Sequence, residues 1–487
     1  MSELSKQAGL LTAADFLRFF IKTLIGIALA RILTPADYGS YRQLFLIYTT
    51  FSTILLLGIP QSMMYFLPKA GGVAEQKKIV TRTMNVISIL ALAFTILILL
   101  TKAEFARRFN NPALNSLLII YCVYPLFMFI TQIYSTIMLG LKEPAQAARF
   151  TLFAIAADFV LVLGVAVFTK DLHFITAAVV VSAFLQWVYA QTKLRRYNEG
   201  WHSGSLKGFG SQLAYCVPLG LSSVVGMLSI QLDKLMISGF FTPEQFAIFS
   251  VGAMELPLIG ILANSVNAIL LPNLSAATPK QLYDTYSGSV RKNALLVFPM
   301  TAIFYILAQE IMVFLYGATY AEAALYFRIY LVILPLRIAT YSILFQALGK
   351  TRIIMINSAI VLCLNFVLNY ILIKALGMKG AAIATVIVTW ISVIIYLAQM
   401  KVILKLRLQK LFPLIKIAKT ALSAVLAAIP CLILQHRISQ PVLRMILVGS
   451  LFSATYLLFS RISGALLPYD VSLGLDFLKD IKKRMGI

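Results

Sequence analysis

Long runs of hydrophobic residues, separated by short polar connections, recur from one end of the chain to the other. A helix that crosses a bilayer needs roughly 20 apolar residues, because each residue advances it by about 1.5 Å. Runs of this kind cover about 10–33, 40–67, 79–100, 114–139, 145–168, 174–194, 212–240, 244–271, 290–316, 324–348, 352–373, 379–402, 412–434 and 441–460. The pattern therefore predicts an all-α polytopic membrane protein with about 14 transmembrane helices.

The composition agrees with this class of protein. Hydrophobic residues make up 60% of the 487-residue chain and charged residues only 12%, with a mean hydropathy of +0.88. Soluble proteins average about 45–50% apolar and about 25% charged residues. The 42 Lys and Arg exceed the 18 Asp and Glu by 24 charges. Nucleic-acid-binding domains gather such charge on one polar surface, whereas here it lies between and inside apolar runs, so we expect no nucleic-acid partner.

The distribution of basic residues predicts the orientation of the chain. With the N-terminus on the inside, the inner connections and the C-terminal tail carry about 26 Lys and Arg, and the outer connections about 7. Cytoplasmic connections are enriched in basic residues, so we expect a multi-pass protein of the bacterial cytoplasmic (inner) membrane with both termini in the cytoplasm. The first run contains Asp15, Arg18 and Lys22, which indicates a retained helix rather than a cleaved signal peptide.

Two halves of the sequence resemble one another. ARILTPADYGSY (30–41) is echoed by SGFFTPEQFAIF (238–249), and DFVL (158–161) by NFVL (365–368), at offsets of about 207–208 residues. We therefore expect two six-helix lobes related by a pseudo-twofold repeat. The expected divisions are 1–205 for an N-lobe with helices 1–6, 206–405 for a C-lobe with helices 7–12, and 406–487 for two additional helices and a basic cytoplasmic tail.

Basic residues within the runs are candidates for function, because a charge near the bilayer centre costs about 2.5–3.5 kcal/mol and requires a partner or a water-filled cavity. Arg18 and Lys22 lie on one helical face with Asp15, and this face either lines a cavity that binds an anion or holds a structural Asp15–Arg18 pair beside a snorkelling lysine. Arg337 follows Pro335 in the middle of its run, where a proline kink exposes backbone to a cavity.

Two further arginines and several acidic residues complete the candidate set. Arg31 and Arg42 flank the first outer turn, either as ligands of a lipid head group or as interfacial anchors. For gating or ion coupling, the candidates are Asp15, Asp233, Glu255 and Asp158. A buried carboxylate such as Glu255 or Asp158 is suited to carrying H⁺ or coordinating Na⁺.

Other kinds of chemistry have little support in the sequence. The four cysteines show no Cys-x-x-Cys spacing and the three histidines lie far apart, so neither a metal site nor a disulfide framework is expected. No phosphate-cradling loop is complete, and we expect no catalytic residues and no cofactor beyond a coupling ion.

Three segments resemble a known family: ARILTPADYGSY (30–41), Asp233-Lys234 with TPEQF (242–246), and LYGATYAEAA (315–324). They are similar to the O-antigen-type flippases, the polysaccharide-export branch of the multidrug/oligosaccharidyl-lipid/polysaccharide (MOP) superfamily. The resemblance implies two V-shaped lobes, a central cavity and alternating access. It also implies a transporter rather than an enzyme, which moves a polyprenyl-diphosphate-linked oligosaccharide to the outer leaflet for surface polysaccharide biosynthesis. Membrane lipids and glycan-assembly enzymes are the expected partners of a monomer.

Two other functions remain open from the sequence. A drug/cation antiporter of the same superfamily would need carboxylates in its cavity, whereas Arg18, Lys22 and Arg337 outnumber Asp15 among the candidates. A membrane-embedded glycan polymerase or glycosyltransferase would carry a long outer loop, and the outer connections here are short.

Overall fold

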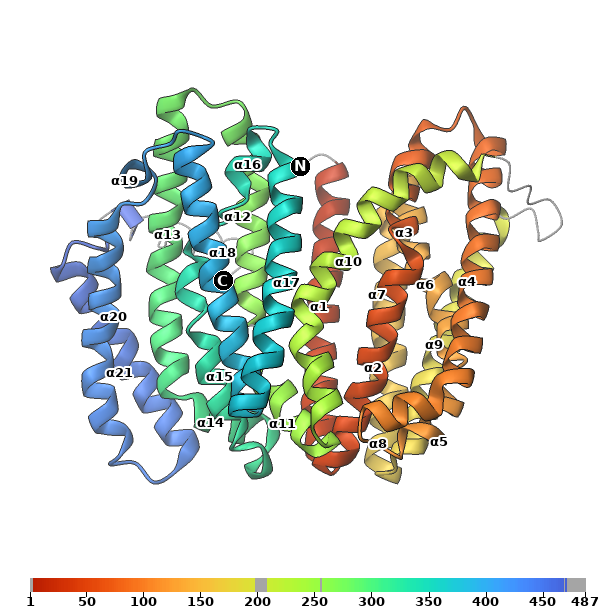
Figure 1. Ribbon diagram of the computed structural model, residues 1–487, viewed down its shortest axis with the longest axis horizontal. Helices are drawn as coiled ribbons and strands as arrows, with labels where there is room; N and C mark the ends of the chain where they lie inside the picture. Colours follow the sequence, from red (N-terminus) through yellow and green to blue (C-terminus); the bar gives the residue numbers. More distant parts are fainter. Residues whose placement is uncertain (1–2, 198–207, 255, 468, 471–487) are drawn as a thin grey trace. The chain divides into compact units, whose positions relative to one another are not determined.

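The structure is a computed structural model that describes residues 3–197, 208–254, 256–467 and 469–470, and every regular element within them is helical (Figure 1). The all-helical prediction is thus confirmed for this part of the chain. Two compact units are present, residues 1–248 and 249–487, and the division between them falls within α11 (Pro243–Gly252). The expected lobe boundary at 205/206 stays a prediction.

Unit 1 contains the helices that surround the candidate site. Its elements are α1 (Glu3–Ile32), α2 (Pro35–Leu56), α3 (Ile59–Phe66), η1 (Leu67–Lys69), α4 (Val73–Arg108), α5 (Leu114–Tyr121), α6 (Tyr124–Gly140), α7 (Pro144–Asp158), η2 (Phe159–Leu163), α8 (Gly164–Thr169), α9 (Leu172–Leu194), η3 (Arg195–Tyr197) and α10 (Phe209–Phe240). Helix α1 packs against α7, while α9 packs against both α6 and α7.

Unit 2 is built in the same way from long helices with short connections. Its elements after α11 are α12 (Pro257–Ser275), α13 (Pro279–Ile306), α14 (Ala308–Tyr316), η5 (Ala318–Tyr320), α15 (Ala323–Leu331), η6 (Leu334–Ile338), α16 (Ile343–Ala347), α17 (Thr351–Leu376), α18 (Met378–Val402), α19 (Leu408–Leu411), α20 (Leu414–Gln435) and α21 (Pro441–Ile462). Helix α17 packs against α18, and α20 packs against α21.

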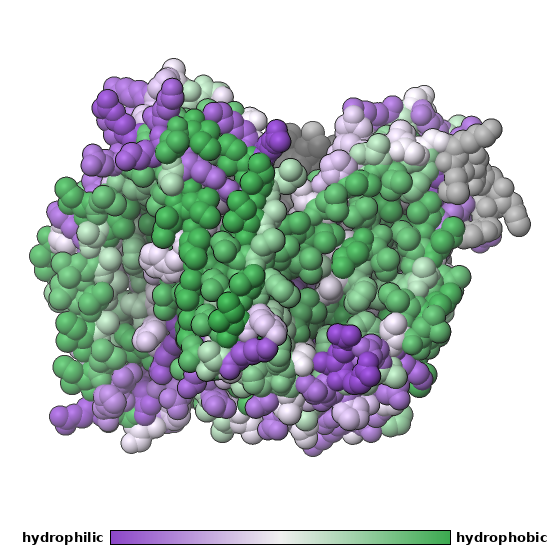
Figure 2. All heavy atoms as spheres, in the orientation of Figure 1, coloured by the Kyte–Doolittle hydropathy of each residue, from purple (hydrophilic) through white to green (hydrophobic). Residues whose placement is uncertain are grey.

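Twelve of the fourteen predicted spans coincide with helical segments that are long and apolar enough to cross a membrane. Eight are single helices and four are bent pairs. The first and eighth predicted spans, which correspond to α1 and to α11 with α12, are not among these candidates. Figure 2 shows hydrophobic residues along the sides of the helices of unit 2 and hydrophilic residues at their ends, as expected for helices in a bilayer.

Two of the four bent spans have an identifiable local cause or sequence signal. Leu57 and Gly58 both adopt left-handed conformations, with φ of 38° and 77°, and the chain turns by 45° between α2 and α3. In unit 2 the chain bends by 41° between α15 and η6–α16. Pro335 lies in the first turn of η6, so the break predicted near this proline is confirmed.

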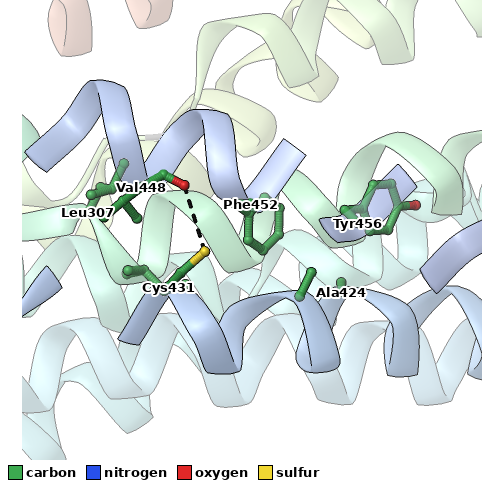
Figure 3. Packing of buried hydrophobic residues seen from close by; sticks show 8 residues of the cluster. Leu307, Ala424, Cys431, Val448, Phe452 and Tyr456 are labelled. Atoms are coloured by element: carbon green, nitrogen blue, oxygen red, sulfur yellow. Dashed lines mark hydrogen bonds between the residues drawn. The ribbon is translucent and has the colours of Figure 1, made fainter. Parts of the chain in front are cut away.

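The two additional C-terminal helices pack onto α13 and α14 within unit 2. Leu307, Ala424, Cys431, Val448 and Phe452 are all at most 5% exposed and form the centre of this contact (Figure 3). The Cys431 thiol donates to the carbonyl oxygen of Val448 at 3.7 Å, which ties α20 to α21. The cysteine therefore serves as a small core residue, as its position in an apolar run indicated.

Candidate functional site

Helices from five parts of unit 1 enclose a cavity of about 250 Å³. Its lining residues are Lys22, Ile25 and Gly26 from α1, Tyr38, Tyr41, Arg42 and Phe45 from α2, Tyr124 from α6, Asp158 and Val162 from α7 and η2, and Val179 from α9. Water occupies about 30 Å³ per molecule in the liquid, so a cavity of this size holds several waters or a hydrated anionic group. We refer to it as the unit 1 cavity.

Helix α1 places its charged stripe on the cavity. Residues four apart lie on one face of a helix, so Arg18, Lys22 and Gly26 form one row. Lys22 and Gly26 line the cavity directly, and the half-buried Arg18 lies one turn before Lys22 on the same row. Because Gly26 has no side chain, the space beside the Tyr38 hydroxyl stays open.

The cations of this region have no acidic partner within ion-pair distance in the described part of the chain. Arg18, Lys22 and Arg42 each lack both an ion pair and a side-chain hydrogen bond to any described residue. The alternative prediction of a structural Asp15–Arg18 pair is therefore wrong, because no such pair forms between these two described residues. Positive charge that the protein itself does not neutralise favours binding of an anion in the cavity.

One carboxylate lines the same cavity, and it is held in place from α9. Asp158 Oδ1 accepts hydrogen bonds from the Ser182 hydroxyl at 2.7 Å and from Gln186 Nε2 at 2.9 Å. Both donors are almost fully buried, at 0% and 4% exposed. Asp158 immediately precedes the π-helical turn η2, a type of helix distortion that is frequent at functional sites.

An aromatic wall completes the cavity. Tyr41 lies between Tyr38 and Phe45, with ring centroids 6.3 Å and 4.9 Å away, and Phe45 meets Tyr124 edge to face at 6.0 Å. Sequence reasoning did not select these rings as site residues. The signal was available, because positions 38, 41, 42 and 45 follow the helix start at Thr34-Pro35 with helical spacing and include Arg42.

The remaining predicted site residues lie elsewhere. Arg337 lines a small, mostly apolar hollow of about 20 Å³ in unit 2, together with Met254, Leu256, Ile259, Tyr330, Leu331, Ile333 and Leu334. Arg31 is exposed at the last turn of α1. Asp233 is 4% exposed in α10, and its Oδ1 accepts the Lys234 backbone N–H at 2.7 Å. Glu255 lies outside the described residues. The structure thus brings Lys22, Arg42 and Asp158 to one cavity.

Solved structures with the same arrangement of helices define the class of protein. The lipid II flippase MurJ in an inward closed conformation matches with a TM-score of 0.77 and 17% identity, covering 93% of this chain and 98% of that one. An inward-facing multidrug resistance MATE family transporter of the MOP superfamily matches with a TM-score of 0.65 and 15% identity, covering 78% and 93%. The chain therefore shares the fold of these two transporters.

Comparison of sequences identifies the family to which the chain belongs. The family described as polysaccharide biosynthesis protein matches residues 28–325, which is more than half of the chain, and the chain belongs to this family. The capsular polysaccharide biosynthesis protein CapF of Staphylococcus aureus is 22% identical over 401 residues, covering 79% of this chain and 96% of CapF. The resemblance drawn from the sequence motifs is confirmed at the level of the polysaccharide biosynthesis family, and the fold matches that of a MOP-superfamily transporter.

Proposed function

We propose that this protein is a flippase that moves a polyprenyl-diphosphate-linked oligosaccharide from the cytoplasmic to the outer leaflet during surface polysaccharide biosynthesis. The observation that carries the proposal is the unit 1 cavity, where Lys22 and Arg42 line a space of about 250 Å³ without an acidic partner among the described residues. A diphosphate is an anion that ammonium and guanidinium groups bind strongly.

Each lining group has a role in this proposal. Arg18 and Lys22 neutralise the diphosphate from α1, and Arg42 approaches it from α2. Arg337, which lines a separate hollow in unit 2, remains a further candidate for binding the anion. The tyrosine wall provides flat apolar faces on which a sugar ring packs. Because transport requires release, a small set of cations serves better than a permanent salt-bridged cluster.

The transport cycle needs a group that responds to the coupling ion. Asp158 is the candidate that lines the same cavity as Lys22, and hydrogen bonds from Ser182 and Gln186 hold its carboxylate in place. In our proposal H⁺ or Na⁺ binds Asp158 as the lobes, residues 1–205 and 206–405, rock between inward and outward states. Asp15, Asp233 and Glu255 remain candidates for gating, and both termini lie in the cytoplasm of a monomer with fourteen spans.

The alternative of a drug/cation antiporter predicts the opposite charge preference. A cationic drug would meet Lys22 and Arg42 in the cavity and only one lining carboxylate, Asp158. We therefore favour the anionic lipid-linked glycan as the substrate.

The test is export of surface glycan in cells that depend on this chain. Lys22→Ala and Arg18→Ala should each abolish export while the protein still reaches the membrane, because the cavity loses charge and the fold loses no ion pair. Lys22→Arg, which keeps the charge, and Lys78→Ala, which removes an exposed cation outside the cavity, are the matched controls. Normal export by both alanine variants would contradict the proposal. In proteoliposomes, inorganic diphosphate should compete with the labelled lipid-linked oligosaccharide for the wild-type protein.

A further inference from the structure

The connection between α18 and α20 is a basic and partly apolar segment at one end of unit 2. Residues 401–419 contain six basic residues and no acidic residue. The six are Lys401, Lys405, Arg407, Lys410, Lys416 and Lys419, and all are exposed. We refer to these residues as the basic connection. Because α18 and α20 are both candidate membrane spans, the connection must lie at a membrane surface.

The basic side chains of this connection are not neutralised by the protein. None of the six forms an ion pair with a residue in the part of the chain that the structure describes. A surface of this kind retains its full positive potential within a Debye length of about 8 Å at physiological salt. Charge of one sign is thus concentrated at the level where phospholipid head groups lie.

Exposed aliphatic side chains stand beside the cations. Val402 is 72% exposed at the end of α18, and Leu414 and Ile415 are 62% and 75% exposed at the start of α20. Apolar residues at this depth face the acyl chains next to the head groups. The alternation of exposed aliphatic and basic positions fits a surface that touches both parts of a phospholipid.

A hollow of about 590 Å³ adjoins the connection. It is lined by Pro279, Lys280, Tyr283 and Asp284 from the start of α13 and by Lys410 from α19. Lys410 Nζ lies 5.8 Å from the centroid of the Tyr283 ring. The Tyr283 hydroxyl accepts the Arg407 backbone N–H at 3.0 Å, so its own proton remains to be donated to a ligand oxygen.

We propose that this hollow and the basic connection bind the head group of an anionic phospholipid. The phosphate lies between Lys280 and Lys410 with the Tyr283 hydroxyl as a hydrogen-bond donor, while Arg407 and Lys405 add positive charge from the neighbouring part of the basic connection. Asp284, the acidic residue of the hollow, forms no ion pair with a described residue and disfavours a second negative charge close to it. The site therefore suits a head group with one phosphate, such as phosphatidylglycerol. This inference does not depend on the proposed transport substrate.

The experiment uses the full-length protein in nanodiscs of phosphatidylcholine and phosphatidylglycerol. A phosphatidylglycerol with a photoreactive group near its phosphate should label peptides from 279–284 and 401–419. In Lys405→Gln/Arg407→Gln/Lys410→Gln, labelling should fall about tenfold or more, because each basic residue contributes strongly to binding an anionic surface. Tyr283→Phe should cause a smaller fall through loss of one donor.

The control removes the same charge elsewhere in unit 2. Lys374→Gln/Lys379→Gln/Arg437→Gln changes the net charge equally at residues outside the hollow and should keep wild-type labelling of 279–284 and 401–419. Equal losses in both triple variants would overturn the proposal, as would labelling spread evenly over all helix ends. If the first triple variant does not fold, Tyr283→Phe and Lys410→Gln provide the same comparison.

Discussion

The basic residues at the unit 1 cavity and two arginines of unit 2, Arg291 and Arg444, have opposite surroundings. In unit 1, Lys22 and Arg42 line a cavity of about 250 Å³ and have no ion-pair partner among the described residues. In unit 2, Arg444 Nη1 lies 2.8 Å from Glu310 Oε1, and Arg291 makes two hydrogen bonds of 2.7 Å and 2.6 Å to the Asp470 carboxylate. A basic residue in a membrane helix is therefore no indicator of function by itself. Whether the fold supplies an acid decides between a binding residue and a structural one.

Removing a cavity cation should have the largest effect on transport. Lys22→Ala should reduce transport of the lipid-linked glycan by about 10-fold to 150-fold, since a hydrogen bond to a charged group contributes about 1.5–3 kcal/mol. The melting temperature in detergent should stay within experimental error of wild type, because no described residue loses an ion-pair partner. Transport is measured in proteoliposomes. Arg337→Ala should reduce transport less than Lys22→Ala does, because the hollow that Arg337 lines has a volume of only about 20 Å³. A large loss of thermal stability in Lys22→Ala would show that Lys22 has a structural role like that of the paired arginines of unit 2.

Breaking an ion pair of unit 2 should lower stability and leave transport nearly unchanged. Arg444→Ala leaves Glu310, which is 9% exposed, without its partner and should lower the free energy of unfolding by about 2 kcal/mol. Transport per folded molecule should stay within about twofold. Thermal unfolding of Arg444→Ala, Glu310→Ala and the double variant measures the coupling energy between the two side chains. The double variant should be no less stable than the less stable of the two single variants. Unchanged stability in Arg444→Ala would show that the pair is not structural.

A second acid placed beside Lys22 should neutralise it, as Glu310 and Asp470 neutralise the arginines of unit 2. Gly26 lies four residues after Lys22 on the same face of α1, and a Cβ atom there meets only an ordinary contact of 3.7 Å with the Tyr38 hydroxyl. Gly26→Asp should therefore pair with Lys22 and reduce transport about tenfold. Gly26→Asn has the same size without the charge and should retain most of the activity. Equal losses in the two variants would indicate a steric effect instead.

The smallest expected effect concerns pH and Asp470, which lies beyond the last described helix. Hydrogen bonds from Arg291 hold the pKa of the Asp470 carboxyl below its ordinary value. A depressed pKa in the folded state means that the stabilisation is present above the ordinary carboxyl pKa and is lost as pH falls through the folded value. Asp470→Asn should lower the free energy of unfolding by about 1 kcal/mol near neutral pH. The resulting difference in melting temperature from wild type should be constant near neutral pH and vanish in acid. A difference that grows in acid would contradict this assignment.

The hydrophobic pattern predicted most of the fold because crossing a bilayer imposes a length and an apolar composition on each helix. Twelve of fourteen spans coincide with candidate membrane helices or bent pairs. The two that do not, α1 and α11 with α12, include the run that carries Asp15, Arg18 and Lys22. The bend at Pro335 was also predictable, because proline cannot continue the hydrogen bonding of a helix.

The site was predictable only in part. Spacing along α1 identified Arg18 and Lys22, since residues four apart share a helical face. It did not reveal that Arg42 and Asp158 line the same cavity as Lys22, or that Tyr38, Tyr41 and Phe45 form its wall. These residues come from helices far apart in the chain. Ser182 and Gln186, which hold Asp158, read as ordinary polar positions in an apolar run.

The sequence by itself determined that this is an all-helical membrane protein, roughly where most of its spans lie, and which superfamily it resembles, because these properties follow from local composition and short motifs. Only the tertiary structure decided which charges are neutralised. Glu310 reaches Arg444 across 134 residues and Asp470 reaches Arg291 across 179, whereas no acid reaches Arg18, Lys22 or Arg42 among the described residues. Pairing of charges depends on which helices pack together, and that is a property of the folded chain alone.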